Sequence, residues 1–141
     1  MSKSGPIIVI DDDVEDHIIM DEIFRNLNYP NKVIYFSDGN AAVDYLKTTE
    51  NPPFLIISDV NMPGMNGFEI RNKICENERL NAQCIPYLFF TTSVDKKAVN
   101  DAYKLSVQGY FMKAATMTDL QNTLRKIIDY WQESYAPSQF N

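Results

Sequence analysis

Three aspartates follow two short apolar runs of this chain. Asp11 and Asp12 come directly after residues 7–10, and Asp59 comes directly after residues 54–58. Continuous apolar runs of this length are typical of buried parallel strands, and open α/β sheets place ligand sites at the carboxyl ends of their strands. If the two strands are neighbours, their carboxylates converge and repel one another unless a cation or protons intervene. Oxygen ligands of this kind suit Mg²⁺, so the pattern predicts a magnesium site at Asp11, Asp12 and Asp59.

A hydroxyl group and an ammonium group follow two further apolar runs. Thr91 follows residues 87–90, and Lys113 follows residues 110–112. Together with the carboxylates, these groups suit a phosphoryl group held on Asp59, because carboxylate nucleophiles can form aspartyl phosphates. Phosphoryl transfer depends mainly on positioning and on neutralising charge on the phosphoryl oxygens. In this hypothesis Lys113 pairs with one phosphoryl oxygen and the Thr91 hydroxyl with another.

Helix capping is the competing explanation for several of these residues. Aspartate and threonine are both favoured at the position that precedes a helix, and Asp13 fits that role best. Capping could also explain Asp11, Asp12 or Thr91 taken singly, but the convergence of several groups on one sheet edge favours chemistry. The backbone carbonyl of Asn61 completes the predicted Mg²⁺ ligands.

Strand-like and helix-like segments alternate along the chain. Short runs rich in β-branched and aromatic residues predict strands at residues 7–10, 32–36, 54–58, 87–90 and 110–112. Apolar residues at helical spacing, with capping residues before them, predict helices at residues 14–27, 39–46, 68–78, 95–106 and 116–131. The alternation predicts an α/β fold, a flavodoxin-like five-stranded parallel sheet of order 2-1-3-4-5 with five helices on both faces.

Composition limits the classes of function that remain. The 141 residues suit one domain, and the net charge of −6 argues against electrostatic binding of nucleic acid. No apolar run is long enough to span a membrane, and the first residues lack the apolar region of a signal peptide. The two cysteines lack metal-ligand spacing and are expected to be free thiols. We therefore expect a cytoplasmic protein with no membrane partner.

The order and intervals of these residues resemble the receiver domain of two-component response regulators. The resemblance rests on the pair Asp11-Asp12, on Asp59 at the start of a D-x-x-M-P-x-x-x-G stretch, on Thr91, and on Lys113 after Gly109-Tyr110. It covers residues 7 to about 131, and the expected domain spans residues 5–133. Residues 134–141 are expected to form a flexible tail.

The resemblance implies a role for each of these side chains. Asp59 would be the phosphoacceptor, with Mg²⁺ as cofactor, and Lys113 would be the phosphate partner. Thr91 would be the switch hydroxyl and Tyr110 the switch aromatic, although Tyr110 is equally well explained as a half-buried strand residue. The family usually has proline after the lysine, whereas this chain has Ala114. The peptide bond before Ala114 is therefore either trans, with a changed loop, or cis and strained.

The implied function is that of a single-domain response regulator in a phosphorelay. It would accept a phosphoryl group from a sensor histidine kinase or a phosphotransfer protein. It would then present a changed surface, formed by residues 95–106, 110–112 and 116–131, to a downstream protein or to a second copy of itself. It is not expected to be an enzyme, beyond catalysing its own phosphorylation and dephosphorylation. The chain is similar to free-standing receivers, which include chemotaxis regulators and the small partners of bacterial phytochromes.

Three other functions are compatible with parts of the pattern. A phosphatase of the haloacid-dehalogenase type would need a second aspartate two residues after the nucleophile, where this chain has Asn61, and a cap insertion. A flavodoxin-like cofactor binder would need a phosphate loop rich in Ser, Thr and Gly after the first strand, where this chain has three aspartates. An inactive receiver that serves as a phosphorylation-independent binding module stays open.

Overall fold

Five parallel strands form one sheet in the computed structural model, which describes residues 1–140. The strands are β1 (Ile7–Ile10), β2 (Val33–Phe36), β3 (Leu55–Ser58), β4 (Tyr87–Thr91) and β5 (Gly109–Met112). Their order in the sheet is β2-β1-β3-β4-β5, as the sequence predicted. Each strand is short, and β1, β3 and β4 are buried along their whole length, which explains why their sequences are apolar or nearly so.

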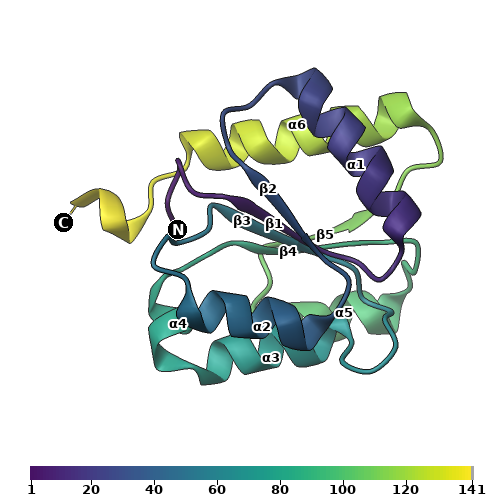
Figure 1. The fold of residues 1–141 in the computed structure, drawn as a ribbon. Coiled ribbons are helices and arrows are strands. Elements are labelled where there is room, and N and C mark those ends of the chain that lie inside the picture. Colours follow the sequence, from purple (N-terminus) through teal and green to yellow (C-terminus); the bar gives the residue numbers. More distant parts are fainter. Residues whose placement is uncertain (141) are drawn as a thin grey trace.

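Helices cover both faces of the sheet. Those described are α1 (Val14–Leu27), α2 (Gly39–Thr48), α3 (Gly67–Glu76), α4 (Glu78–Ala82), α5 (Lys96–Lys104) and α6 (Met117–Glu133). Helices α1 and α6 lie on one face, and α2, α3 and α5 lie on the other (Figure 1). The described residues thus contain six helices rather than the five predicted. The extra helix arises because Asn77 ends α3 and its side chain then caps α4, accepting from the Leu80 amide.

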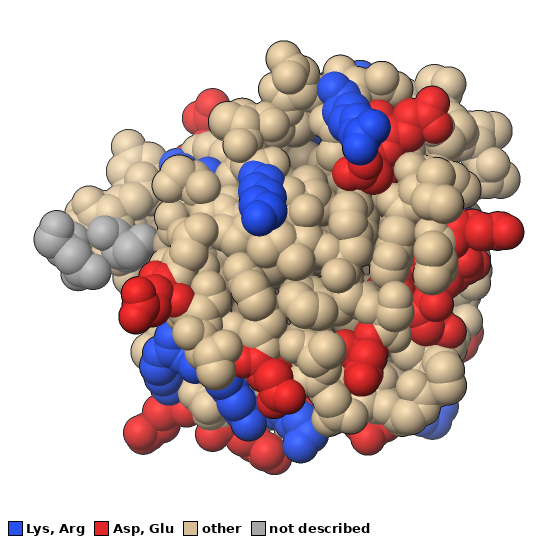
Figure 2. Space-filling model, viewed as in Figure 1, with Lys and Arg blue, Asp and Glu red and all other residues tan. Residues whose placement is uncertain are grey.

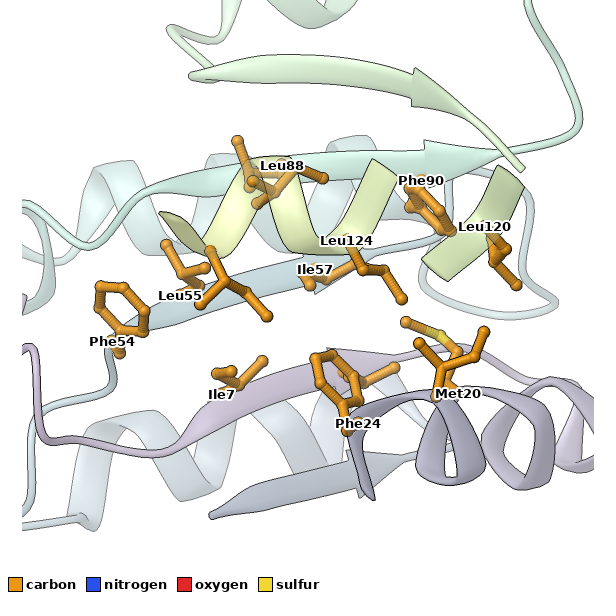
Figure 3. Packing of buried hydrophobic residues seen from close by; sticks show 14 of the residues in the cluster. Ile7, Met20, Phe24, Phe54, Leu55, Ile57, Leu88, Phe90, Leu120 and Leu124 are labelled. Carbon is orange, nitrogen blue, oxygen red and sulfur yellow. The ribbon is translucent and has the colours of Figure 1, made fainter. Parts of the chain in front are cut away.

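Two hydrophobic clusters hold these layers together. Figure 3 shows the first cluster, in which side chains of α1 and α6 pack against those of β1, β3 and β4 on one face of the sheet. The second cluster lies on the other face, under α2, α3 and α5. Because apolar side chains are withdrawn from water on both faces, the sheet is fixed and its carboxyl edge can hold polar side chains in set positions.

Capping residues set the start of the helices that border this edge. Asp13 caps α1 by accepting a hydrogen bond from the Glu15 amide at 2.9 Å, as predicted. Thr116 caps α6 by accepting a hydrogen bond from the Asp119 amide at 3.2 Å. An ordinary hydrogen bond of this kind stabilises a helix end by about 1 kcal/mol.

The end of the chain follows α6 closely. A 3₁₀ turn spans Pro137–Phe140, and Ala136 is buried in the first hydrophobic cluster. The flexibility expected for residues 134–141 stays a prediction, and Asn141 lies outside the described residues. Within residues 1–140, no helix is both long enough and apolar enough to cross a membrane.

Candidate functional site

The sheet brings Asp11, Asp12 and Asp59 together. Strands β1 and β3 are neighbours, and Ile10 pairs with Ser58, so the residues that follow them lie side by side. The Asp59 amide continues the ladder by donating to the Ile10 carbonyl at 2.9 Å. One carboxylate oxygen from each of the three aspartates lies within 4.8 Å of the others. The convergence predicted from the two strand ends is therefore present.

Lys113 lies against this cluster. Its amide donates to the Thr91 carbonyl at 2.8 Å, which fixes the backbone at the end of β5 beside β4. Its Nζ lies 2.6 Å from Asp11 Oδ2 and 3.2 Å from Asp59 Oδ2. The Lys113 side chain is 14% exposed and that of Asp11 is 3% exposed, so this ion pair is largely shielded from water. The ammonium group thus reaches the predicted phosphoacceptor from the other side of β4.

Asp16 is a fourth carboxylate that the sequence analysis missed. It lies in the first turn of α1, and its Oδ2 is 2.8 Å from Lys113 Nζ. Aspartate in a first helical turn normally has an electrostatic explanation of its own, because it interacts favourably with the helix dipole. That ordinary explanation hides the contact with Lys113, so the sequence carries no separate signal for it.

Burial and charge act in opposite directions on these groups. Burial raises the pKa of the Asp11 carboxyl, and the hydrogen bond from Lys113 reduces this rise without cancelling it. Burial by itself lowers the pKa of Lys113, but the hydrogen bonds to Asp11 and Asp16 outweigh it, and the net shift is upward. Burial also acts to raise the pKa of Asp16, yet contact with Lys113 makes the net shift downward. Lys113 is therefore held firmly in its charged form.

Backbone amides fix two of the carboxylates. Asp11 Oδ1 accepts from the Asp13 amide at 2.9 Å, and Asp59 Oδ1 accepts from the Val60 amide at 2.7 Å. Gly67 allows the loop after Asp59 to pack tightly, since a Cβ there would lie 2.3 Å from the Asp59 carbonyl oxygen. The orientation of both carboxylates is thus set by the chain that follows each strand.

His17 lies beside the site. It is half-buried and stacks on Tyr35, with ring centroids 5.2 Å apart. Its Nε2 donates to the Asp11 carbonyl at 2.6 Å. The short strand β2 carries Tyr35 alongside the start of α1, so the imidazole can stack on the tyrosine ring.

The predicted switch residues lie on the other side of the site, around Ser93. Thr91 is buried, and its hydroxyl accepts from the Ser93 amide at 3.2 Å. The Tyr110 hydroxyl donates to the Ser93 carbonyl, and Asn61 Nδ2 donates to Ser93 Oγ at 2.6 Å. Ser93, which the sequence analysis did not single out, therefore links the loops after β3 and β4 with the β5 aromatic side chain.

The sequence left open whether the peptide bond between Lys113 and Ala114 is trans or cis. No cis peptide bond occurs among residues 1–140, so this bond is trans. The amide of Lys113 nevertheless keeps its ladder hydrogen bond to Thr91. The alanine therefore leaves Lys113 within reach of the carboxylates.

The donor set fits Mg²⁺. Three carboxylates offer one oxygen each within 4.8 Å, and hard oxygen ligands of this kind suit Mg²⁺, which keeps several waters. Asp12 is exposed, so the cluster is open to solvent on that side. Acidic side chains also gather along the edge of the molecule where the turn before α1 lies (Figures 1 and 2). Their field attracts cations toward this edge.

Comparison with known proteins identifies the family. The model of the response regulator receiver domain matches residues 7–125. The chain belongs to this family. A receiver domain with this sheet order is the arrangement that the sequence predicted. Four of the residues that carried the resemblance lie together at one edge of the sheet, namely Asp11, Asp12, Asp59 and Lys113.

Relatives of similar length support the same assignment. A probable methanogenesis regulatory protein, FilR2, from Methanothrix harundinacea is 30% identical over 89% of this chain and 82% of its own. Response regulator Rcp1 from Synechocystis is 29% identical over 91% of this chain and 89% of its own. The crystal structure of the phosphorylated cyanobacterial phytochrome response regulator RcpA has a TM-score of 0.84 at 25% identity and covers 96% of this receiver and 99% of RcpA.

Proposed function

We propose that this receiver accepts a phosphoryl group on Asp59 in a Mg²⁺-dependent reaction and thereby switches a protein-binding surface. The observation that carries the proposal is the contact of Lys113 Nζ with Asp59. Two further carboxylates, those of Asp11 and Asp12, lie close enough to Asp59 to share one metal ion with it. A lysine that follows a partly exposed edge strand would normally lie in solvent. Here it is shielded and placed at the acidic group that would carry the phosphate.

Asp59 is the proposed nucleophile. A carboxylate oxygen of Asp59 attacks the phosphorus of a phosphohistidine, the P–O bond forms, the P–N bond breaks, and the imidazole of the donor leaves. The Val60 amide holds the carboxylate in place through Asp59 Oδ1. Such fixed orientation is a large part of what a protein contributes to phosphoryl transfer. Water later hydrolyses the acyl phosphate and regenerates the carboxylate.

Charge on the phosphoryl group must be neutralised for this step. Lys113 would pair with one phosphoryl oxygen, since its ammonium already lies 3.2 Å from Asp59 Oδ2. The residues that would hold Mg²⁺ are Asp11, Asp12 and Asp59 with the Asn61 carbonyl, and the ion would neutralise further negative charge on the phosphoryl oxygens. A related crystal structure contains the Mn²⁺-bound form of a response regulator named Rcp1, with a TM-score of 0.81 at 27% identity, covering 95% of this chain and 99% of that one.

Thr91 and Tyr110 would transmit the change. The Thr91 hydroxyl can exchange the Ser93 amide for a phosphoryl oxygen, and the Tyr110 hydroxyl can then leave the Ser93 carbonyl. Reversing a two-state equilibrium completely takes about 5.5 kcal/mol of differential stabilisation. Hydrogen bonds to charged groups contribute about 1.5–3 kcal/mol each, so one from Thr91 and one from Lys113 supply much of it.

The surface that changes would be formed by α5, β5 and α6. Tyr110 lies in β5, and Tyr103 on α5 is 53% exposed. A downstream protein, or a second copy of the chain, would bind there when Asp59 is phosphorylated. The phosphoryl donor would be a sensor histidine kinase or a phosphotransfer protein. The protein would catalyse no reaction apart from its own phosphorylation and dephosphorylation, and we expect it to act in the cytoplasm without a membrane or nucleic-acid partner.

Intact-mass measurement tests the proposal. The protein is incubated with phosphoramidate, with and without Mg²⁺, beside the variant Asp59→Asn. A single phosphoryl adduct that requires Mg²⁺ and is missing from Asp59→Asn is expected. The proposal fails if no adduct forms on the wild-type chain, or if the adduct survives in the variant. The first of these outcomes would favour a binding module that works without phosphorylation.

A further inference from the structure

The three protons of the Lys113 ammonium have three carboxylate partners. Asp11 is nearest at 2.6 Å, Asp16 follows at 2.8 Å, and Asp59 is the most distant at 3.2 Å. Two of the partners belong to strand ends at the site. Asp16 belongs to α1, and it draws the ammonium toward the helix and away from Asp59.

The partners differ in what else they do. Asp11 and Asp59 are proposed cation ligands, so Lys113 and a divalent cation compete for their oxygens. Asp16 is outside the group of carboxylates that converge within 4.8 Å. It is also half-buried, with a side chain that is 29% exposed, so its attraction for Lys113 is less screened than that of a surface carboxylate. When Asp16 holds the ammonium, the carboxylate oxygens of Asp11 and Asp59 are more available to the divalent cation.

Lys113 has room to change partners. A cavity of about 150 Å³ lies beside the contact and is lined by Asp16, Lys113 and the residues that lead into α6, among them Ala114. The small Ala114 side chain borders the same cavity. The long, flexible stem of lysine can therefore move between α1 and the strand ends without displacing packed side chains.

We propose that Asp16 is a positioning residue that holds Lys113 back from Asp59 before phosphorylation and gives it up to the phosphoryl group afterwards. This rests on the proposed function of Asp59. In the unphosphorylated protein the contact with Asp16 weakens the hold of the ammonium on Asp11 and Asp59, so a cation displaces it from them more readily. During transfer it competes with the phosphoryl oxygens for the same ammonium. Asp16 thus strengthens cation binding and slows the transfer step, two effects of opposite sign from one carboxylate.

The variant Asp16→Asn separates these effects. It keeps the size of the side chain and removes its charge. Binding of Mn²⁺, measured by electron paramagnetic resonance without any phosphodonor, should weaken about fivefold, within the range of coupling between contacting residues. At saturating Mg²⁺, the rate of adduct formation from phosphoramidate should rise about threefold, because Lys113 is freed for the phosphoryl oxygens.

Asp13→Asn is the matched control. It removes the same charge three residues earlier, and asparagine keeps the helix cap. Both quantities should change less than about twofold in this control, as expected for a charge that does not contact Lys113. Equal effects of the two variants would overturn the proposal, since net charge alone would then explain them. A rate at saturating Mg²⁺ that falls or stays constant in Asp16→Asn would also overturn it.

A second background tests whether Asp16 acts through Lys113. In Lys113→Met, the further change Asp16→Asn should weaken Mn²⁺ binding no more than Asp13→Asn does. A full fivefold loss in that background would show that Asp16 acts on the cation directly, contrary to the proposal. The binding measurements need no phosphoryl group. A wild-type chain that forms no adduct would therefore contradict the proposed function of Asp59 while the Mn²⁺ results still decide whether Asp16 controls Lys113.

Discussion

Two halves of the site are held together by different interactions. The charged half is defined by the ion-paired residues Asp11, Asp16, Asp59 and Lys113. The hydroxyl half is defined by the residues that meet at the loop after β4, namely Asn61, Thr91, Ser93 and Tyr110. In the first half the contacts of Lys113 join two full charges, and in the second every contact is a neutral hydrogen bond.

In the proposed function, this difference would separate the residues of phosphoryl transfer from those of the switch. Hydrogen bonds to charged groups contribute about 1.5–3 kcal/mol, whereas neutral ones contribute about 0.5–1.5 kcal/mol. The charged half is therefore costly to take apart unless a phosphoryl group or a cation replaces the lost partner. The hydroxyl half can exchange partners at little cost, which is what a switch requires. Four substitutions test this division, given from the largest expected effect to the smallest.

Replacing Lys113 should have the largest effect on stability. Lys113→Met leaves several carboxylates, one of them the buried Asp11, without their cation. The free energy of unfolding should fall by about 3 kcal/mol, as for other buried ion pairs that lose one partner. Added Mg²⁺ should restore part of the loss, because it replaces the missing positive charge.

Urea unfolding with and without Mg²⁺ measures both effects. Lys126→Met is the control. It removes the same charge as Lys113→Met, but from an exposed side chain on α6. It should change stability by less than about 0.5 kcal/mol. A loss in Lys113→Met that matches the control would show that the charged half contributes little to stability.

Replacing Thr91 should affect the switch more than the fold. Thr91→Val keeps the shape of the buried side chain but removes the acceptor for the Ser93 amide. Stability should fall by about 1.5 kcal/mol, the lower part of the range for an amide left unpaired. Asp59 should still be phosphorylated, while the shift of the Tyr110 ring signals on phosphorylation, followed by NMR, should disappear. Persistence of that shift would remove Thr91 from the switch.

Replacing the Tyr110 hydroxyl should have a smaller effect. Tyr110→Phe keeps the ring that packs near Phe89, with centroids 5.8 Å apart, and loses only the bond to the Ser93 carbonyl. Stability should fall by about 1 kcal/mol, and amide hydrogen exchange in the loop after β4 should become faster. Unchanged exchange there would mean that the hydroxyl does not hold this loop.

Thr92→Ala should have the smallest effect. Thr92 is exposed and follows Thr91, the predicted switch hydroxyl. Its replacement should therefore change the free energy of unfolding by less than about 0.5 kcal/mol. Its side chain adds bulk beside the site, and its removal should speed adduct formation from phosphoramidate about twofold, equivalent to about 0.4 kcal/mol in the barrier. An unchanged rate would show that Thr92 does not restrict entry of the donor.

The strand ends explain why much of the site could be predicted. Asp11 and Asp59 follow apolar runs, and in a parallel sheet of known order such positions must meet. Lys113 follows β5 and reaches them across β4, which a long side chain allows. The metal ligation by the Asn61 carbonyl and the roles of Thr91 and Tyr110 stay predictions, because they concern a phosphorylated or cation-bound state.

Residues that act from a helix were harder to foresee. Asp16 and His17 are adjacent in sequence, and both reach the site only because α1 starts beside Asp11 at a particular rotation. Sequence gives the spacing along a helix but not the direction of its first turn relative to a neighbouring loop. The break at Asn77 had a local signal, since asparagine is a good cap, but the continuous helical pattern around it hid that signal.

The two faces of the sheet are covered by helices at different stages of synthesis of the chain. One face is covered by α2, α3 and α5, whose sequence is contiguous with the central strands. The other is covered by α1 and α6, the first and the last α-helix of residues 1–140, and the Tyr29 hydroxyl, just after α1, donates to Asp129 of α6 at 2.6 Å. On a ribosome the part of this second face that α6 covers stays open until α6 emerges, so until then the nascent chain exposes a strip of apolar sheet to chaperones.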